Sequence, residues 1–278
     1  MTVRIVTDSA CDLPQAVADA HGIEIVPLTI RFGGTEFTDR LDLSVDEFWR
    51  RSAASAELPE TAAPSPGQYE ETFRRLAGAG ADGVVCIALS GELSATIQSA
   101  RLAADSVADT IRVEVVDSRS VTMGLGMIVL TAARRAEEGA DVDTIVKEAV
   151  SLAERTRVWG ALDTLENLKK GGRIGGAKAL VASVLSIKPI IEVRNGKVEE
   201  GGKQRTRARA LAFLIDKVRK QGPVENLAVM HADTDDVDAF IERLRPFAAG
   251  EIVVGDIGPV IGSHSGRGAI GVVFQLPA

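Results

Sequence analysis

The residues best placed to bind a small acid surround Ser94. An apolar run over 84–89 predicts a buried strand, and Ile97, Ala100 and Ala104 follow it at helical spacing. Ser94 therefore lies near the first turn of a predicted helix, where unpaired backbone N–H groups and the helix dipole attract a carboxylate or a phosphate. Serine is also a favoured N-cap residue, so Ser94 either contacts a ligand or only caps the helix.

Thr61 and His264 are the other candidates for contact with a ligand. Thr61 offers a hydroxyl in a stiff loop over 60–67, although threonine also starts turns or caps them locally. His264 lies in a predicted Gly-rich loop over 258–269, and glycine lets the backbone approach a ligand closely. His231 ends an apolar strand and His21 precedes Gly22 at a predicted helix end, so we interpret both as structural.

These residue types permit more than one chemistry. Hydroxyls and an imidazole can hold an acid, or Ser94 can act as a nucleophile with His264 as base and Asp8 or Asp117 as the orienting acid. The G-x-S-x-G pattern of many serine hydrolases is absent around Ser94. A weaker alternative is a phosphate-binding module at 169–173, which contains lysines and glycines without the order of a Walker loop.

Composition excludes several classes of protein. A net charge of −7 and an aromatic content of 4% argue against nucleic-acid binding. The three histidines and two cysteines are scattered, so we expect no metal site and no disulfide, and the turn residues Asp8 and Asp12 are explained more simply by capping than by a cation. We expect no cofactor. With no signal-peptide pattern and no apolar run near the roughly 20 residues that span a bilayer, we expect a cytoplasmic protein without an integral membrane segment.

The elements that must position these residues predict an α/β domain over 1–156. Strands over 3–6, 23–30, 84–89 and 113–116 alternate with helices, which is typical of a parallel sheet covered on both faces. Pro27 cannot donate to a neighbouring strand and places its own strand at an edge or bulge. In such sheets ligands collect beyond the carboxyl ends of the strands, where the loops around Asp8, Thr61, Ser94 and Asp117 can converge.

The pattern changes after Thr156 and predicts an α+β domain over 157–278. Asn195-Gly196 indicates a hairpin, and helices over 206–219 and 235–247 follow, with strands at 226–231, 251–254 and 271–275. Basic residues form two groups in this half of the chain, namely Lys169, Lys170, Arg173 and Lys178, and Lys203, Arg205, Arg207 and Arg209. The second group stands near a helix start, where positive charge opposes the dipole, and suggests an anionic partner if it is not simply a solvated face.

Taken together, seven short motifs in this order resemble the DegV family of bacterial fatty-acid-binding proteins over essentially the whole chain. The motifs are Thr7-Asp8-Ser9 with Asp12-Leu13-Pro14; Thr61 to Pro66; Leu93-Ser94 with Gln98-Ser99-Ala100; Asp117-Ser118; Lys170-Gly171-Gly172-Arg173-Ile174; Ile187-Lys188-Pro189-Ile190; and Gly262 to Gly268.

The resemblance implies an N-terminal α/β domain, a C-terminal α+β domain and a long-chain fatty acid, such as palmitate, buried between them. It implies that the carboxylate is held by the hydroxyls of Thr61 and Ser94 beside His264, with Ala62, Ala95 and Arg173 also at this site. It further implies that this chain supplies no catalytic nucleophile, and that a separate ATP-dependent kinase subunit, which makes the acyl phosphate, contacts it near Lys203 and Arg205.

The sequence departs from the family pattern at the predicted carboxylate site. Ala62 and Ala63 replace the usual Ser-Gln, and Ala95 and Ile97 replace Gly and Tyr. Arg267 replaces a common proline. Backbone N–H groups and His264 are therefore expected to hold more of the carboxylate. For the acyl chain we expect a tunnel lined by apolar residues of the C-terminal domain, namely Val184, Leu185, Ile187, Ile190 and Ile191.

Overall fold

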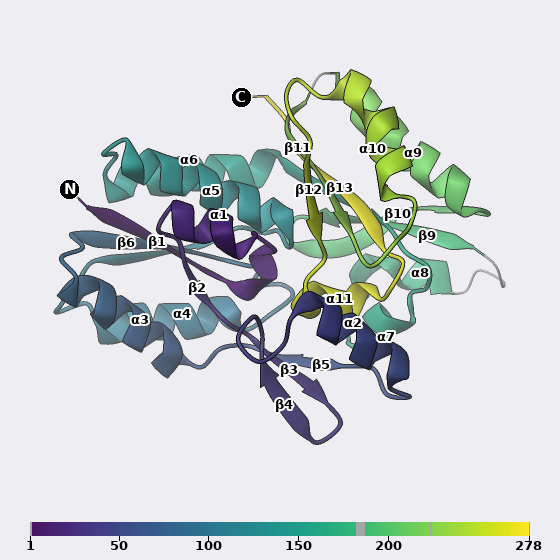
Figure 1. The fold of residues 1–278 in the computed structure, drawn as a ribbon. Helices are drawn as coiled ribbons and strands as arrows, with labels where there is room; N and C mark the ends of the chain where they lie inside the picture. Colours follow the sequence, from purple (N-terminus) through teal and green to yellow (C-terminus); the bar gives the residue numbers. More distant parts are fainter. Residues whose placement is uncertain (1, 182–186, 223, 278) are drawn as a thin grey trace.

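The computed structural model describes residues 2–181, 187–222 and 224–277 of the chain, arranged around three sheets. The first is a four-stranded parallel sheet in the order β2-β1-β6-β7. Its strands are β1 (Val3–Asp8), β2 (Glu24–Val26), β6 (Gly83–Ala88) and β7 (Val113–Asp117). The helices α3 (Pro66–Gly78) and α4 (Thr96–Ser106) cover one face, and α5 (Met123–Glu137) and α6 (Val142–Arg155) cover the other (Figure 1). The predicted parallel α/β sheet is thus confirmed.

A small antiparallel sheet in the order β4-β3-β5 lies beside the first. It consists of β3 (Thr29–Phe32), β4 (Thr35–Thr38) and β5 (Glu60–Ala62), and α1 (Gln15–Ala20) and α2 (Val45–Ala54) belong to the same half of the chain. The prediction of one strand over 23–30 was wrong, because the chain leaves β2 at Pro27, which has no N–H group to continue the ladder. The predicted loop at 60–62 is a strand, since Thr61 pairs with Ile30 of β3.

The C-terminal half forms a six-stranded sheet in the order β10-β9-β8-β13-β11-β12. Its strands are β8 (Thr156–Ala161), β9 (Lys188–Arg194), β10 (Lys197–Gln204), β11 (Glu225–His231), β12 (Val253–Asp256) and β13 (Ile270–Gln275). The predicted hairpin joins β9 to β10, and both turn residues, Asn195 and Gly196, have positive φ (53° and 80°). Thr156, where the sequence pattern changes, is the first residue of this sheet.

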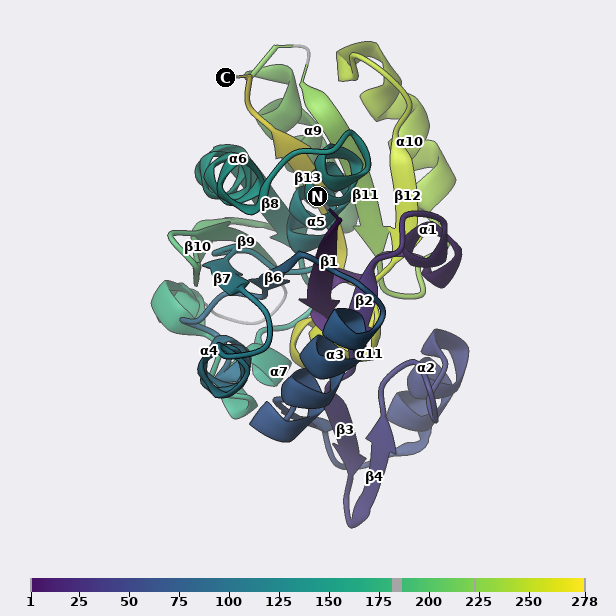
Figure 2. The ribbon, with the colours of Figure 1, turned by 90° about the vertical axis from the view of Figure 1, so that its left-hand side faces the viewer.

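The described part of the C-terminal half contains five α-helices, namely α7 (Glu166–Lys170), α8 (Lys178–Val181), α9 (Arg207–Arg219), α10 (Val237–Leu244) and α11 (Pro259–Ser265). Figure 2 shows α9 and α10 on the outer side of the sheet. Helix α10 is shorter than predicted because Pro246 interrupts helical hydrogen bonding, so a 3-10 turn at Arg245–Phe247 follows it. The predicted Gly-rich loop at 258–269 was also wrong in part: Pro259 at the first helical position starts α11, and Gly266, with a φ of 76°, ends it.

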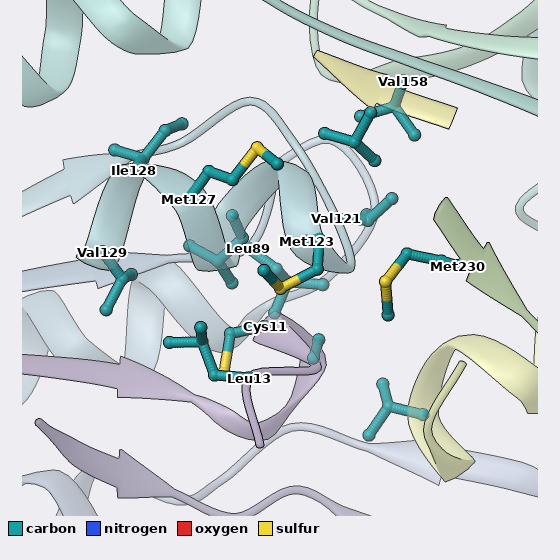
Figure 3. Packing of buried hydrophobic residues seen from close by; sticks show 14 of the residues in the cluster. Cys11, Leu13, Leu89, Val121, Met123, Met127, Ile128, Val129, Val158 and Met230 are labelled. Carbon is teal, nitrogen blue, oxygen red and sulfur yellow. The ribbon is translucent and has the colours of Figure 1, made fainter. Parts of the chain in front are cut away.

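Helix α5 packs against both large sheets and joins the two halves of the molecule. It contacts β1 and β6 of the parallel sheet and β8, β11 and β13 of the six-stranded sheet. Figure 3 shows side chains of α5 among residues from both sheets and their adjoining loops; it labels Met123, Met127, Ile128, Val129, Cys11, Leu13, Leu89, Val121, Val158 and Met230. All of them belong to one hydrophobic cluster, so the two sheets share a core rather than meeting across a polar interface.

Two further observations concern the described part of the chain. Cys11 and Cys86 are both buried and unpaired. No helix there combines the length and the apolar character needed to cross a membrane.

The packing of α5 generates a prediction about stability. Ile128 is 0% exposed within the shared core, so Ile128→Ala should lower the free energy of unfolding by about 2–5 kcal/mol, the range for large-to-small core substitutions. Urea unfolding of single-tryptophan variants that keep either Trp49 or Trp159, followed by fluorescence, measures this change separately in the two halves. The matched variant Arg134→Ala, on the exposed face of α5, should change stability by less than about 0.5 kcal/mol. A loss confined to one tryptophan signal would contradict a shared core.

Candidate functional site

A mostly apolar pocket lies between the two halves of the chain. Its empty volume is ≈ 620 Å³, which includes its open side. Segments from both halves line it, and their residues are Leu28, Thr61, Leu89, Leu93, Ser94, Val121, Leu168, Arg173, Ile191, Val193, Val198, Val260, Ile261, His264 and Ser265. Thr61, Ser94, Arg173 and His264 are thus brought to one cavity from distant parts of the sequence.

Thr61 and His264 are polar residues of this pocket that also line an adjoining open cleft, and this part of the pocket is called its polar end. Thr61 Oγ1 and His264 Nε2 share a hydrogen bond of 3.0 Å between residues 203 apart in the chain. Thr61 is held by the pairing of β5 with β3, and His264 lies in the last turn of α11, which packs against both β3 and β5. The packing of α11 against the small sheet therefore places the imidazole of His264 beside the hydroxyl of Thr61.

The environment of His264 keeps its ring neutral. Burial, with a smaller contribution from the positive charge of Arg173, lowers the pKa of His264 from 6.5 to about 4. Nδ1 is buried without a hydrogen-bond partner, and a Cβ atom at Gly171 would lie 2.5 Å from it. Gly171 is therefore required because the imidazole packs directly on its backbone. A neutral imidazole can still donate one hydrogen bond to an acid.

Contacts along its length fix α11, and with it His264. Asn167 Nδ2 of α7 donates to the carbonyl oxygen of Ser263 (3.1 Å). Gly262 lies against the rings of α2, since a Cβ atom there would be 2.7 Å from Phe48 and 2.8 Å from Trp49. At the helix start, the N–H of Gly258 donates to Asp12 Oδ1 (3.1 Å). Asp12 therefore does not cap α1 as expected, because its carboxylate binds α11 instead, and α1 begins without a side-chain cap.

Asp12 belongs to a group of buried acids around Arg40. Burial raises the pKa of Asp8 and of Asp12 to about 7 each and that of Asp39 to about 6. The positive charge of Arg40 opposes this rise, and its Nη1 donates to the carbonyl oxygen of Leu13 (2.8 Å). Near neutral pH this group therefore carries less negative charge than three ordinary aspartates.

Carboxylates also position the loop that carries Ser94. The N–H of Leu89 donates to Asp8 Oδ2 (2.7 Å), and the N–H of Gly91 donates to both oxygens of Asp117 (3.3 Å). Ser94 follows this braced segment, where its Oγ accepts from the N–H of Thr96 (3.3 Å) and bonds Thr96 Oγ1 (2.9 Å). The hydroxyl of Ser94 thus contacts the start of α4 and lines the pocket at the same time.

Arg173 connects the Ser94 loop to the segment after α7. Its Nε donates to the carbonyl oxygen of Leu93 (3.0 Å), and its Nη1 donates to that of Gly171 (2.7 Å). Both acceptors are neutral, so the positive charge of Arg173 faces the pocket without an ion-pair partner among the described residues. A bound anion would meet this charge.

Other predicted residues lie elsewhere. Ala62 and Ala95 are exposed and do not line the pocket. Of the expected tunnel residues, Ile191 lines the pocket, whereas Ile190 points to the opposite face of β9 and packs with the outer cluster around Trp159, because side chains alternate along a strand. Ile187 is partly buried but is not part of the lining, and Val184 and Leu185 lie outside the described residues.

Most of the apolar lining was not predicted from the sequence. Val193 and Val198 pair across the hairpin and both face the pocket. The Asn-Gly turn predicts that the two strands pair, and period-two alternation predicts that Val193 and Val198 lie on one face of the hairpin. Leu28, Val121 and Val260 come from three separate segments, and only the folded chain shows that they meet.

The arrangement does not form a catalytic triad. His264 forms a hydrogen bond with Thr61 rather than with Ser94, and among the described residues no carboxylate forms a hydrogen bond with its ring. Asp8 and Asp117, the proposed orienting acids, instead accept from backbone N–H groups. The same ranges contain no group of three or more histidine, cysteine or acidic residues that could hold a metal ion.

The residues of the second basic group (Lys203, Arg205, Arg207 and Arg209) differ in their surroundings. Arg207, at the start of α9, forms an ion pair with Asp236 (2.8 Å) and lies 3.8 Å from Asp163. Its charge is therefore neutralised within the fold and does not indicate an anionic partner. Lys203 and Arg205 are exposed at the end of β10 and just after it.

The fold and the pocket define an α/β protein with an apolar pocket between two sheets that share one core. The chain belongs to the DegV family: the family profile described as "Uncharacterised protein, DegV family" matches residues 2–276. A DegV domain-containing protein of Streptomyces coelicolor is 39% identical, and the match covers 98% of each chain.

Solved structures agree with this assignment. A DegV family protein from Thermus thermophilus, described as fatty-acid binding, is 33% identical over 100% of both chains with a TM-score of 0.93. A stearic-acid-binding protein from Eubacterium ventriosum is 26% identical over 98% of both chains with a TM-score of 0.89. The predicted fold and family are thus confirmed.

The burial of His264 predicts an unusual titration. In protein labelled with ¹⁵N-histidine, the ring of His264, assigned by its loss in His264→Gln, should titrate with a midpoint near pH 4 and stay neutral at pH 6. Arg173→Gln should move this midpoint upward, because it removes a nearby positive charge. A midpoint near the ordinary value of about 6.5 would show that the ring is solvated.

Proposed function

We propose that this protein binds a long-chain fatty acid, with its carboxylate at Thr61 and His264 and its acyl chain in the apolar pocket. The observation that carries the proposal is the pocket itself: apolar side chains line most of it, and the Thr61–His264 pair stands at one end with Ser94 and Arg173. A tailed acid needs this combination of an apolar wall and a small polar end. Binding of fatty acids by DegV proteins of similar fold supports the assignment.

The energetics favour such a ligand. Burying a sixteen-carbon chain is worth on the order of 10 kcal/mol at about 0.8 kcal/mol per methylene. Moving the carboxylate out of water costs several kcal/mol unless hydrogen-bond donors meet it. Ser94 can donate such a bond, and so can Thr61 when the neutral ring of His264 donates its own N–H to the Thr61 oxygen, while Arg173 supplies a positive charge. The proposal requires no cofactor.

Removing the hydroxyls tests the proposed carboxylate site. Thr61→Val and Ser94→Ala should each weaken palmitate binding by roughly 1–3 kcal/mol, the cost of one hydrogen bond to a charged group. Isothermal titration of delipidated protein measures the change. Thr72→Ala, which removes an exposed hydroxyl on α3, is the matched control and should bind as the unaltered protein does. Unchanged affinity in the double variant would exclude both hydroxyls from the site.

We further propose that the bound acid is phosphorylated by a separate ATP-dependent kinase. The carboxylate oxygen would attack the γ-phosphorus of ATP, giving an acyl phosphate and ADP. An open cleft of ≈ 1000 Å³ adjoins the pocket and shares Thr61, Arg173 and His264 with it, so the carboxyl end can be approached from outside. Lys203 and Arg205 are the proposed kinase contacts, and Arg205 forms no ion pair with any described residue.

This second step predicts a variant that separates binding from transfer. Arg205→Ala should leave palmitate affinity unchanged and slow acyl-phosphate formation by the partner kinase at least several-fold, because it removes an exposed charge outside the pocket. The measurement is ADP release in the presence of kinase, ATP and loaded protein. Arg243→Ala, an exposed arginine of α10, controls for loss of charge alone. An equal rate for Arg205→Ala would remove this residue from the kinase contact.

A further inference from the structure

A second cavity, which shares Val193 with the apolar pocket, is lined by three arginines. Its empty volume is ≈ 840 Å³ including its open side, and its lining is Arg119, Ala153, Glu154, Thr156, Arg157, Val193, Arg194 and Asn195. Glu154 is the one acidic residue among these. The cavity therefore collects positive charge on a chain whose overall charge is −7.

The three arginines come from both halves of the molecule. Arg119 follows β7, where its own N–H is fixed by Asp117 Oδ1 (2.8 Å). Arg157 and Arg194 belong to β8 and β9 of the six-stranded sheet. The β9–β10 turn is bound to the first half, since Ser90 Oγ donates to the carbonyl oxygen of Gly196 (2.7 Å) and Lys197 pairs with Glu92 (3.3 Å). The relative positions of the arginines are thus set by contacts that do not use them.

The positive charges of the three arginines are not balanced by ion pairs. The β8–β9 ladder ends with the pair Val158–Val193, so Arg157 and Arg194 are the next residues on two neighbouring strands, which brings like charges close together. Like charges close together on neighbouring strands destabilise a sheet. Across the described ranges, none of the three arginines has an ion pair, and Arg157 donates only to the carbonyl oxygens of Glu154 (2.7 Å) and Thr156 (2.9 Å). An anion in the cavity would relieve this repulsion.

We propose that this cavity binds a phosphate group, carried by a small phosphate ester or by a phospholipid headgroup. Arginine is the residue best suited to this ligand, because its planar fork of N–H donors matches two phosphate oxygens at once. A phosphate monoester near neutral pH carries about 1.5 to 2 negative charges, which suits three arginines beside one glutamate. The site is separate from the fatty-acid pocket and does not depend on the function proposed for it.

The first experiment uses inorganic phosphate as the probe with the full chain. Phosphate should raise the melting temperature and give a measurable Kd by ³¹P NMR, whereas chloride at equal ionic strength should not. Arg119→Gln and Arg194→Gln should each raise the Kd at least fivefold, and Arg194→Gln should also raise the melting temperature without phosphate, because it removes the like charge close to Arg157. Arg101→Gln, an exposed arginine of α4, is the control and should leave the Kd unchanged.

The second experiment distinguishes the source of the phosphate. Vesicles of phosphatidylcholine with and without phosphatidic acid are tested by co-sedimentation with the same variants. Binding of inorganic phosphate alone indicates a soluble ester, and binding only to phosphatidic-acid vesicles, lost in Arg119→Gln and Arg194→Gln, indicates a headgroup. The proposal is overturned if neither probe binds, or if both variants bind as well as the unaltered chain.

Discussion

The hydrogen bond between Thr61 and His264 is the contact on which the rest of the site depends. It joins a short strand of the first half of the chain to a short helix near its end, and both would be marginal alone. Packing and hydrogen bonds with the surrounding structure stabilise them. Gly262 lets α11 approach the rings of Phe48 and Trp49, and Asp12 and Asn167 hold its two ends. The polar end of the pocket is thus built by packing rather than by a local motif.

The same contact argues against a general-base role for His264. A histidine that acts as a general base needs a partner that orients it and a pKa near the working pH. His264 has an unpartnered Nδ1 and a pKa lowered to about 4, and its Nε2 bonds a threonine. These properties suit a fixed hydrogen-bond partner for an acid. The sequence left both acid binding and hydrolysis open, because residue types alone do not show which atoms form hydrogen bonds with one another.

The sequence predicted the α/β half well because each buried strand there is a short apolar run between polar turns, as at 84–89. The Asn-Gly turn likewise predicted the β9–β10 hairpin correctly. The failures have physical causes. Four glycines suggested a loop around His264, yet Pro259 and the tertiary contacts of α11 produce a helix. Strand β5 was missed because its pairing with β3 is non-local. Arg207 was taken for a misplaced charge because its partner, Asp236, lies 29 residues away.

The buried acids around Arg40 have a consequence for the electrical behaviour of the whole chain. Asp8, Asp12 and Asp39 keep their protons at pH values where aspartate in an unfolded chain has lost them, so these three groups take up protons on folding. His264 and the carboxyl groups whose pKa values are lowered act in the opposite direction, but near neutral pH they have largely lost their protons in the native state and in the unfolded chain alike. The charge of −7 counted from the sequence is therefore more negative than that of the native protein near neutrality. Near neutral pH, denaturation therefore releases protons from these buried carboxyl groups into the solvent.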